Sequence, residues 1–281
     1  MKTYDIVIVA LLAAAAAVFQ LAHGIIGIPT GFGMTVDLVA VPVLLAFFIF
    51  GLEHSLWVLL IASIVITLVA PDSWLGASMK FSATLPMVLI PAFYLLSREK
   101  KASFPLLAAL AVFAAFAVLV LPGSANIAAQ STALQLNRTS AYSVPGFSLQ
   151  GTEVIKGTTV TAGMLLLGLL PIAVLILLSA VLLYIWKKYA GAVALKPLRN
   201  AHIAIVVLVA ALAVRALATV VSNYYYAGPL FFGMSTETFM SAVPWYLIAG
   251  WNCFQGILEF GIAWVLAYGF GFAKSYGDWA G

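Results

Sequence analysis

The sequence predicts an all-α integral membrane protein with eight transmembrane helices. Hydrophobic residues make up 64% of the 281-residue chain and charged residues only 8%, whereas about 25% of the residues in a soluble domain are charged. The apolar residues are gathered in eight stretches, whose lengths approach or exceed the roughly 20 residues that a helix needs to cross a bilayer. Because lipid cannot hydrogen-bond to the backbone, helices are the expected form of these stretches.

The eight expected helices follow one another along the whole chain. The second and third are the shortest, so the sequence defines their ends least well. The first resembles a secretory signal, but no small-residue cleavage pattern follows it in residues 23–26, so we expect it to be retained. The expected helices cover residues 4–22, 38–52, 55–70, 80–96, 105–121, 159–186, 201–226 and 243–272.

Lysine and arginine predict the orientation, because cytoplasmic loops of membrane proteins carry an excess of both. We attribute the net charge of +4 to this excess in cytoplasmic loops, and we expect no nucleic-acid partner. We expect a multi-pass plasma-membrane protein with both termini in the cytoplasm and the long polar stretch 122–158 outside. The basic residues then expected inside are Lys2, Arg98, Lys100, Lys101, Lys187, Lys188, Lys196, Arg199 and Lys274. Those expected elsewhere are Lys80, Arg138, Lys156 and Arg215.

One membrane domain in three parts is expected. Core helices occupy residues 1–101 and 201–281, and residues 102–200 form a helical hairpin with the long external loop. Asn137 begins a glycosylation sequon in that loop, although so short a pattern often arises by chance. The single cysteine, Cys253, excludes an internal disulfide.

Four ionisable residues fall within or beside the expected helices: Asp37, Lys80, Arg215 and Glu259. Such residues are costly in lipid and therefore indicate function. Arg215 and Glu259 lie at similar depth, about 20 Å from the inner ends of their helices at ~1.5 Å per residue, so we expect them to pair. The simpler interpretation is that this pair only ties the last two helices together.

Amide side chains line one face of the last expected helix. Asn252, Gln255 and Glu259 have i, i+3 and i+7 spacing. This pattern suits either ligand recognition or the hydrogen bonds that join membrane helices. Asn223 ends the preceding helix, and the three tyrosines that begin at Tyr224 are also typical of an interfacial aromatic belt.

Motifs of common enzymes do not occur in the sequence. There is no Gly-x-x-x-x-Gly-Lys phosphate loop, no Gly-x-Ser-x-Gly elbow and no His-Glu-x-x-His pair. His23, His54 and His202 lack the spacing of metal ligands, so no metal site is expected. The sequence therefore favours a binding or transport role over an enzyme.

Five short stretches carry a resemblance to a known family. They are ALLAA at 10–14, VDLVAVPVL at 36–44, SWLGASMKF at 73–81, NYYYAGPL at 223–230 and WNCFQG at 251–256. Together they resemble the substrate-binding S components of energy-coupling factor (ECF) transporters, most closely the riboflavin-specific branch. The resemblance covers the first four and the last two expected helices. It implies a six-helix core, to which the hairpin in 102–200 is an addition.

The resemblance also implies a riboflavin site. Asp37 and Asn223 stand where family members hold the flavin ring, and Asn252 and Gln255 match a recognition element on the last helix. An amide can donate and accept hydrogen bonds, as the edge of the flavin ring requires. Gln255 replaces a lysine, and Gly250 replaces a proline, of many members. The same stretches add four candidate substrate-binding residues: Trp74, Met79, Lys80 and Tyr224.

Partners follow from the resemblance too. The alanine face of the first helix, with Ala10 and Ala14, is expected to contact a transmembrane coupling protein that two cytosolic ATPase subunits drive. The glycine-rich stretch 24–33 resembles the family's external lid, where glycine supplies conformational freedom. No cofactor is expected, since riboflavin is the transported ligand.

Three alternatives stay open at this stage. An S component for another vitamin or heterocycle would keep the class and change the ligand. A stand-alone proton-coupled carrier would use Arg215 and Glu259, but it would be expected to show an inverted repeat and broken helices. A structural subunit or lipid-modifying enzyme would be expected to cluster histidines or carboxylates at the interface.

Overall fold

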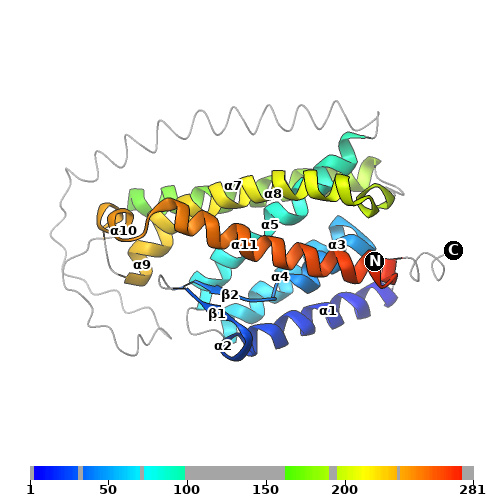
Figure 1. The fold of residues 1–281 in the computed structure, drawn as a ribbon, viewed down its shortest axis with the longest axis horizontal. Helices are drawn as coiled ribbons and strands as arrows, with labels where there is room; N and C mark the ends of the chain where they lie inside the picture. Colours follow the sequence, from blue (N-terminus) through cyan, green and yellow to red (C-terminus); the bar gives the residue numbers. More distant parts are fainter. Residues whose placement is uncertain are drawn as a thin grey trace.

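The described part of the chain is a bundle of long helices lying side by side (Figure 1). A computed structural model describes residues 3–30, 34–69, 73–98, 162–189, 195–232 and 235–273. The expected helix 105–121, the loop that follows it and the Asn137 sequon lie outside these residues. The α-helices are α1 Thr3–Leu21, α2 His23–Ile26, α3 Val41–Phe50, α4 Leu52–Val69, α5 Ser73–Ser97, α7 Ala162–Tyr189, α8 Ala201–Ser222, α9 Gly228–Phe232, α10 Thr236–Ala242 and α11 Trp245–Trp264. The other elements are the strands β1 Ile28–Pro29 and β2 Thr35–Val36, the 3-10 helix η1 Lys196–Arg199, and the π-helical turns η2 Asn223–Ala227 and η3 Val265–Gly269.

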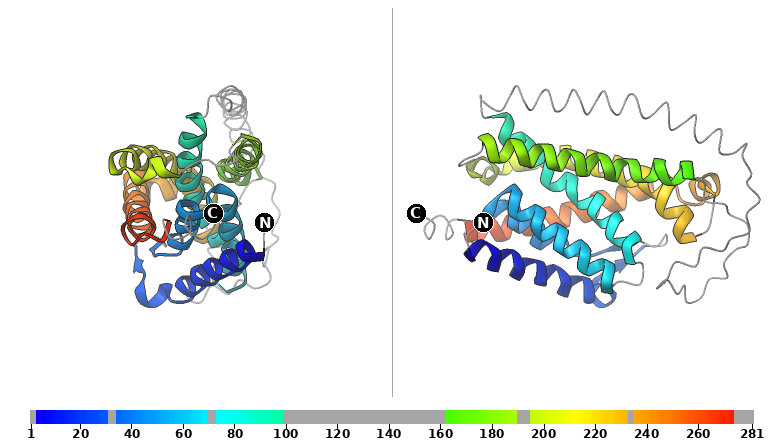
Figure 2. Two further views of the ribbon diagram at one scale, coloured as in Figure 1. Left: turned by 90° about the vertical axis from the view of Figure 1, so that its right-hand side faces the viewer. Right: turned by 180° about the vertical axis from the view of Figure 1, so that it is seen from behind.

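The helical, apolar character that the sequence predicts is confirmed. Within the described residues, the helical segments long and apolar enough to cross a membrane are Thr3–Leu21, Leu52–Val69, Trp74–Ser97 and Ala201–Phe232. The predicted number of eight membrane spans stays a prediction. The second arm of the expected hairpin is present as α7, which packs against α5 and α8 (Figure 2).

The second expected helix is shorter than the sequence suggests. Helix α3 has 10 residues, about 15 Å at the usual rise, which is half of the hydrocarbon thickness. The chain turns at Gly51, whose φ of 90° favours glycine. A Cβ at this position would also lie 2.9 Å from the Trp186 ring. The apolar run of 38–52 is therefore split, and α4 already begins at Leu52.

Polar contacts join several helices at one end of the bundle, which we call the Glu53 end. Glu53 of α4 forms an ion pair with Lys187 of α7 at 2.8 Å. His54 Nε2 lies 3.7 Å from Asp5 Oδ1 of α1. The opposite end carries the antiparallel β1–β2 ribbon, α9 and α10 (Figure 1). We call it the ribbon end.

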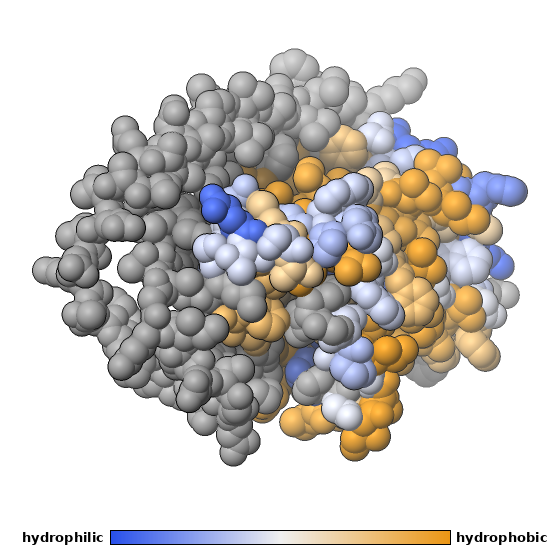
Figure 3. Space-filling model, turned by 60° about the vertical axis from the view of Figure 1, so that its left-hand side comes forward, coloured by the Kyte–Doolittle hydropathy of each residue, from blue (hydrophilic) through white to orange (hydrophobic). Residues whose placement is uncertain are grey.

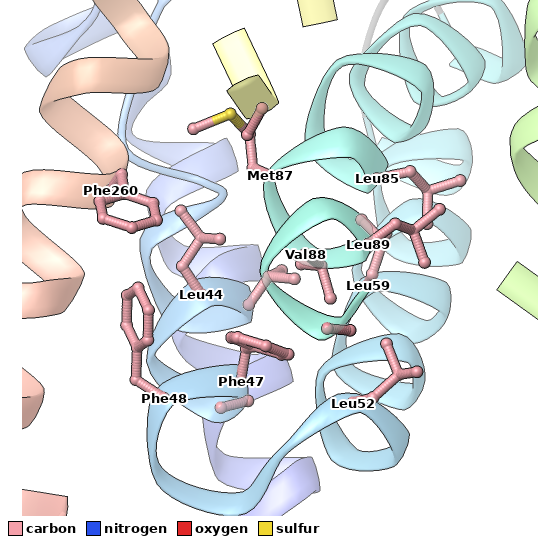
Figure 4. Close-up of a cluster of buried hydrophobic side chains, with 14 of the residues drawn as sticks. Leu44, Phe47, Phe48, Leu52, Leu59, Leu85, Met87, Val88, Leu89 and Phe260 are labelled. Carbon is pink, nitrogen blue, oxygen red and sulfur yellow. The ribbon is translucent and has the colours of Figure 1, made fainter. Parts of the chain in front are cut away.

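An apolar core joins α3, α4, α5 and α11 (Figure 4). Phe48 of α3 meets Phe260 of α11 edge to face, with ring centroids 5.0 Å apart. Leu44, Met87 and Val88 lie beside them and are fully buried or nearly so. In a membrane, such side chains stabilise the bundle by close van der Waals packing, because lipid tails are as apolar as the core itself.

Apolar side chains also cover much of the outer surface (Figure 3). A soluble monomer rarely exposes large continuous apolar patches, whereas lipid favours them. This outer surface fits a membrane-embedded protein. Examples with exposed side chains are Val7, Leu11 and Val18 of α1, Leu60 and Ile64 of α4, Val206 and Val209 of α8, and Phe254 and Ile257 of α11.

Candidate functional site

Five polar residues from distant parts of the sequence are linked inside the bundle, and Asn252 lies one turn away from them on α11; we call all six the polar cluster. Five of them are at most 4% exposed, and the Lys80 side chain is 19% exposed. They come from the β2–α3 connection, α5, α8 and α11. The members are Asp37, Lys80, Arg215, Asn252, Gln255 and Glu259.

The Arg215–Glu259 ion pair is the most deeply buried part of the polar cluster. Arg215 Nη1 donates to Glu259 Oε2 at 2.7 Å, which ties α8 to α11. Gly256 makes this close packing possible, because a Cβ there would lie 2.6 Å from Leu212 Cδ2 and 3.4 Å from Arg215 Cδ. The depths of Arg215 and Glu259 along their helices predicted this pair, whereas no motif indicated Gly256, which directly follows Gln255.

Gln255 connects the buried pair to the rest of the polar cluster. Its Nε2 donates to Glu259 Oε1 at 2.8 Å and lies 3.5 Å from the backbone oxygen of Asp37. The first bond runs along one face of α11, as the i, i+4 spacing requires. The second contact reaches across to the segment that precedes α3. One amide therefore bridges two elements.

Asp37 is held by two protein partners. One carboxylate oxygen forms an ion pair with Lys80 Nζ, and the other accepts from the backbone N–H of Val39 at 3.1 Å. A carboxylate that accepts from the N–H two residues later forms an Asx turn, and this turn leads the chain into α3. Asp37 and Lys80 were both expected to contact substrate, which stays a prediction. In this structure they contact each other.

Asn252 lies one turn before Gln255 on the same face of α11. Its Nδ2 donates to the Ile248 backbone oxygen at 2.9 Å and lies 3.5 Å from Met34 Sδ. Met34 immediately precedes β2, so the segment next to the ribbon contacts Asn252. No motif in the sequence singled out Met34.

Asn223 and Tyr224 sit in the π-helical turn η2. Asn223 Nδ2 donates to the Thr219 backbone oxygen at 2.8 Å, and the Tyr224 hydroxyl donates to the Val243 backbone oxygen at 3.0 Å. Gly228 lets this turn form, because a Cβ there would lie 2.5 Å from the Phe239 ring. π-Helical turns are often found at functional sites. Tyr224 packs in one apolar cluster with Met34 and Ile248, next to Asn252.

Trp74 and Met79 belong to another group of side chains. The rings of Trp74 and Tyr226 have centroids 5.8 Å apart, and Met79 packs against the cluster that contains Tyr226. Ser78 Oγ lies 2.9 Å from the Tyr226 hydroxyl oxygen. Ile172 of α7 completes this cluster. Ile172 thus packs α7 against the ribbon end of α5, and a substrate role for Trp74 and Met79 stays a prediction.

The alanines of α1 are divided between two faces. Ala10 and Ala14 are exposed on the outside of the bundle, whereas Ala13 and Ala16 are buried against it. The expected coupling residues are therefore on the accessible side of α1.

The described residues show no metal centre at the polar cluster. No group of three or more histidine, cysteine, aspartate or glutamate side chains suited to a metal ion occurs among the described residues. A small apolar hollow is lined by Tyr94, His202, Ile203 and Val206 at the Glu53 end of α5 and α8. It carries little polar chemistry, so we base the candidate site on the polar cluster.

Comparison of the chain with family models, with curated proteins and with solved structures gives no match. The polar cluster combines acceptors, donors and balanced charges in one buried region, which suits recognition of a neutral polar molecule.

Proposed function

We propose that this chain is the substrate-binding subunit of an ECF-type vitamin importer, and that it captures riboflavin or a related flavin from the outer side of the plasma membrane. One observation carries the proposal. Asp37, from the connection before α3, and Gln255 and Asn252, one turn apart on α11, are implied as ligand contacts by the family resemblance, and all three are buried on the same side of α11, where Gln255 contacts the Asp37 backbone and Asn252 contacts Met34.

The charge balance of the polar cluster supports a neutral ligand. Asp37 is matched by Lys80, and Glu259 is matched by Arg215. An anionic or cationic ligand would disturb this balance in a region with little access to water, where an uncompensated charge is costly. Riboflavin is neutral and carries both hydrogen-bond donors and acceptors, so it fits this environment.

The distribution of basic residues supports the orientation. Lys187, Lys188, Lys196 and Arg199 lie in the segments α7 and η1 that meet at the Glu53 end. By the positive-inside rule, this end faces the cytoplasm. The polar cluster would then be reached from the opposite, ribbon end, where β1 and β2 would act as the lid.

Riboflavin fluorescence tests the proposal directly. The purified chain in detergent is titrated into riboflavin, and binding should quench or shift the flavin emission with a saturable curve. Heat-denatured protein at the same concentration is the control. A flat curve with folded protein would remove the flavin assignment, and a parallel titration with other neutral heterocycles would test the alternative S component.

Coupling to partner subunits has its own test on α1. The Ala10→Leu/Ala14→Leu variant should bind riboflavin normally and lose ATP-driven uptake, because bulky side chains on the exposed face would keep a coupling helix away. The matched control is Ala13→Leu on the buried face, which should lower the stability of the chain itself. Normal uptake by the double variant would exclude this face from coupling to the transmembrane protein and its two ATPase subunits.

A stand-alone proton-coupled carrier is the second candidate, and the buried Arg215–Glu259 pair is the observation that favours it. Buried ionisable residues in membrane helices often form proton pathways. Uptake by vesicles that contain only this chain, driven by a pH gradient without ATPase subunits, would support the carrier. Uptake that requires the ATPases would exclude it.

A further inference from the structure

The amide of Gln255 has its direction imposed by Glu259. The Glu259 carboxylate is paired with Arg215, so its oxygens accept hydrogen bonds and have no proton to donate. The Gln255 NH2 group, 2.8 Å from Glu259 Oε1, is therefore the only end of the amide that can face it. Rotation of the amide by 180° would place two acceptors against each other in a buried region, which is unfavourable.

The orientation of the Asn252 side-chain amide is fixed in the same way. Its Nδ2 donates to the backbone oxygen of Ile248, which can only accept. Among the described residues, no group donates a hydrogen bond to Gln255 Oε1 or Asn252 Oδ1. Both residues lie on one face of α11 and are only 3% exposed. Two carbonyl oxygens from one face of α11 are thus left as acceptors for a ligand.

We propose that Glu259, held by Arg215, is a positioning residue that turns Gln255 into a hydrogen-bond acceptor, so that Gln255 and Asn252 together select ligands by their N–H or O–H donors. This inference rests on the proposed function and adds the polarity of recognition to it. The ring system of riboflavin has one such donor, the N–H at ring position 3.

The functional consequence is a preference for ligands that carry one N–H group at the recognised position. A ligand with N–H at the recognised position satisfies a carbonyl oxygen, whereas the N-methyl analogue leaves that oxygen buried without a partner. An unsatisfied buried acceptor weakens binding by an amount that corresponds to about ten-fold or more in dissociation constant. A glutamine free to rotate would instead offer its NH2 group and reduce this preference.

The test compares riboflavin with 3-methylriboflavin by fluorescence titration of the full chain in detergent. The unaltered protein should bind riboflavin at least about ten-fold more tightly than the methyl analogue. Gln255→Met removes the acceptor at similar size, and it should reduce that ratio to near one. Gln20→Met in α1 makes the same change at another buried position and should keep the ratio.

Glu259→Gln tests the positioning role, because a glutamine at 259 can donate as well as accept and no longer fixes Gln255. The ratio should fall in this variant, whereas a purely structural role for Glu259 would weaken both ligands equally. If the variant does not fold because Arg215 loses its charged partner, the Arg215→Met/Glu259→Leu double variant removes both charges and tests the same role, and its ratio should fall as well. Riboflavin binding with no preference over 3-methylriboflavin would overturn this inference and leave the proposed function standing. No riboflavin binding at all would remove the proposed function and this inference with it.

Discussion

Two ion pairs in the polar cluster differ in how they are exposed. The side chains of Arg215 and Glu259 are 1% and 2% exposed, so both charges are sealed between α8 and α11. Asp37 is equally buried at 2%, but the Lys80 side chain is 19% exposed. A sealed pair can only be maintained or broken, whereas a lysine on a flexible stem can leave its partner and return. We infer that the first pair positions the site and the second can open for ligand.

Breaking the sealed pair should have the largest effect. Arg215→Ala or Glu259→Ala leaves one buried charge without its partner, and loss of one partner of a buried pair typically destabilises by roughly 3 to 5 kcal/mol. Thermal unfolding in detergent should show a large drop in midpoint for each variant. The Arg215→Met/Glu259→Leu double variant removes both charges and should recover much of the loss. A double variant no more stable than the singles would contradict this account.

Breaking the second pair should have an intermediate effect. Lys80→Met leaves Asp37 charged but still accepting from the Val39 N–H, so about 1 to 3 kcal/mol of stability is expected to be lost. The same thermal assay measures it, with Lys80→Arg as the variant that keeps the charge. If Lys80→Met destabilised the chain as much as Arg215→Ala does, the distinction between a sealed and an openable pair would fail.

The Glu53–Lys187 pair extends the series to an exposed case and should have the smallest effect. Its side chains are 27% and 55% exposed, with Lys187 Nζ 2.8 Å from Glu53 Oε1. Exposed pairs contribute about 0 to 1 kcal/mol. Lys187→Ala should therefore shift the unfolding midpoint little, and added salt should reduce even that shift. A loss of stability comparable to that of Lys80→Met would show that burial does not determine how much each ion pair contributes to stability.

Most of the helical fold follows from apolar runs, and the exceptions have local causes. The sequence could not show that α3 ends at Gly51, where φ is 90° and the ring of Trp186, from a distant helix, leaves no room for a Cβ. Nor could it show the π-helical turn at Asn223, which ends at Gly228, where the Phe239 ring leaves no room for a Cβ. Both glycines pack against residues from other helices. Periodicity in a single segment carries no information about such contacts.

The candidate site could be predicted in part. Arg215 and Glu259 were paired by their similar depth along two helices, and depth is readable from sequence. The Asp37–Lys80 pair was not foreseen, because the connection before α3 has no regular register against α5. The direction of the Gln255 amide was also hidden, since it follows from the charge state of Glu259 one turn away.

Binding by variants of the two amides tests the central claim most directly. Riboflavin is titrated against the unaltered chain, Asn252→Ala and Gln255→Ala, with Gln20→Ala as a control for removal of a buried amide elsewhere. Loss of one recognition hydrogen bond should weaken binding by about 1 to 3 kcal/mol in each variant, and the control should bind normally. Identical dissociation constants for all four proteins would show that the polar cluster is not the ligand site.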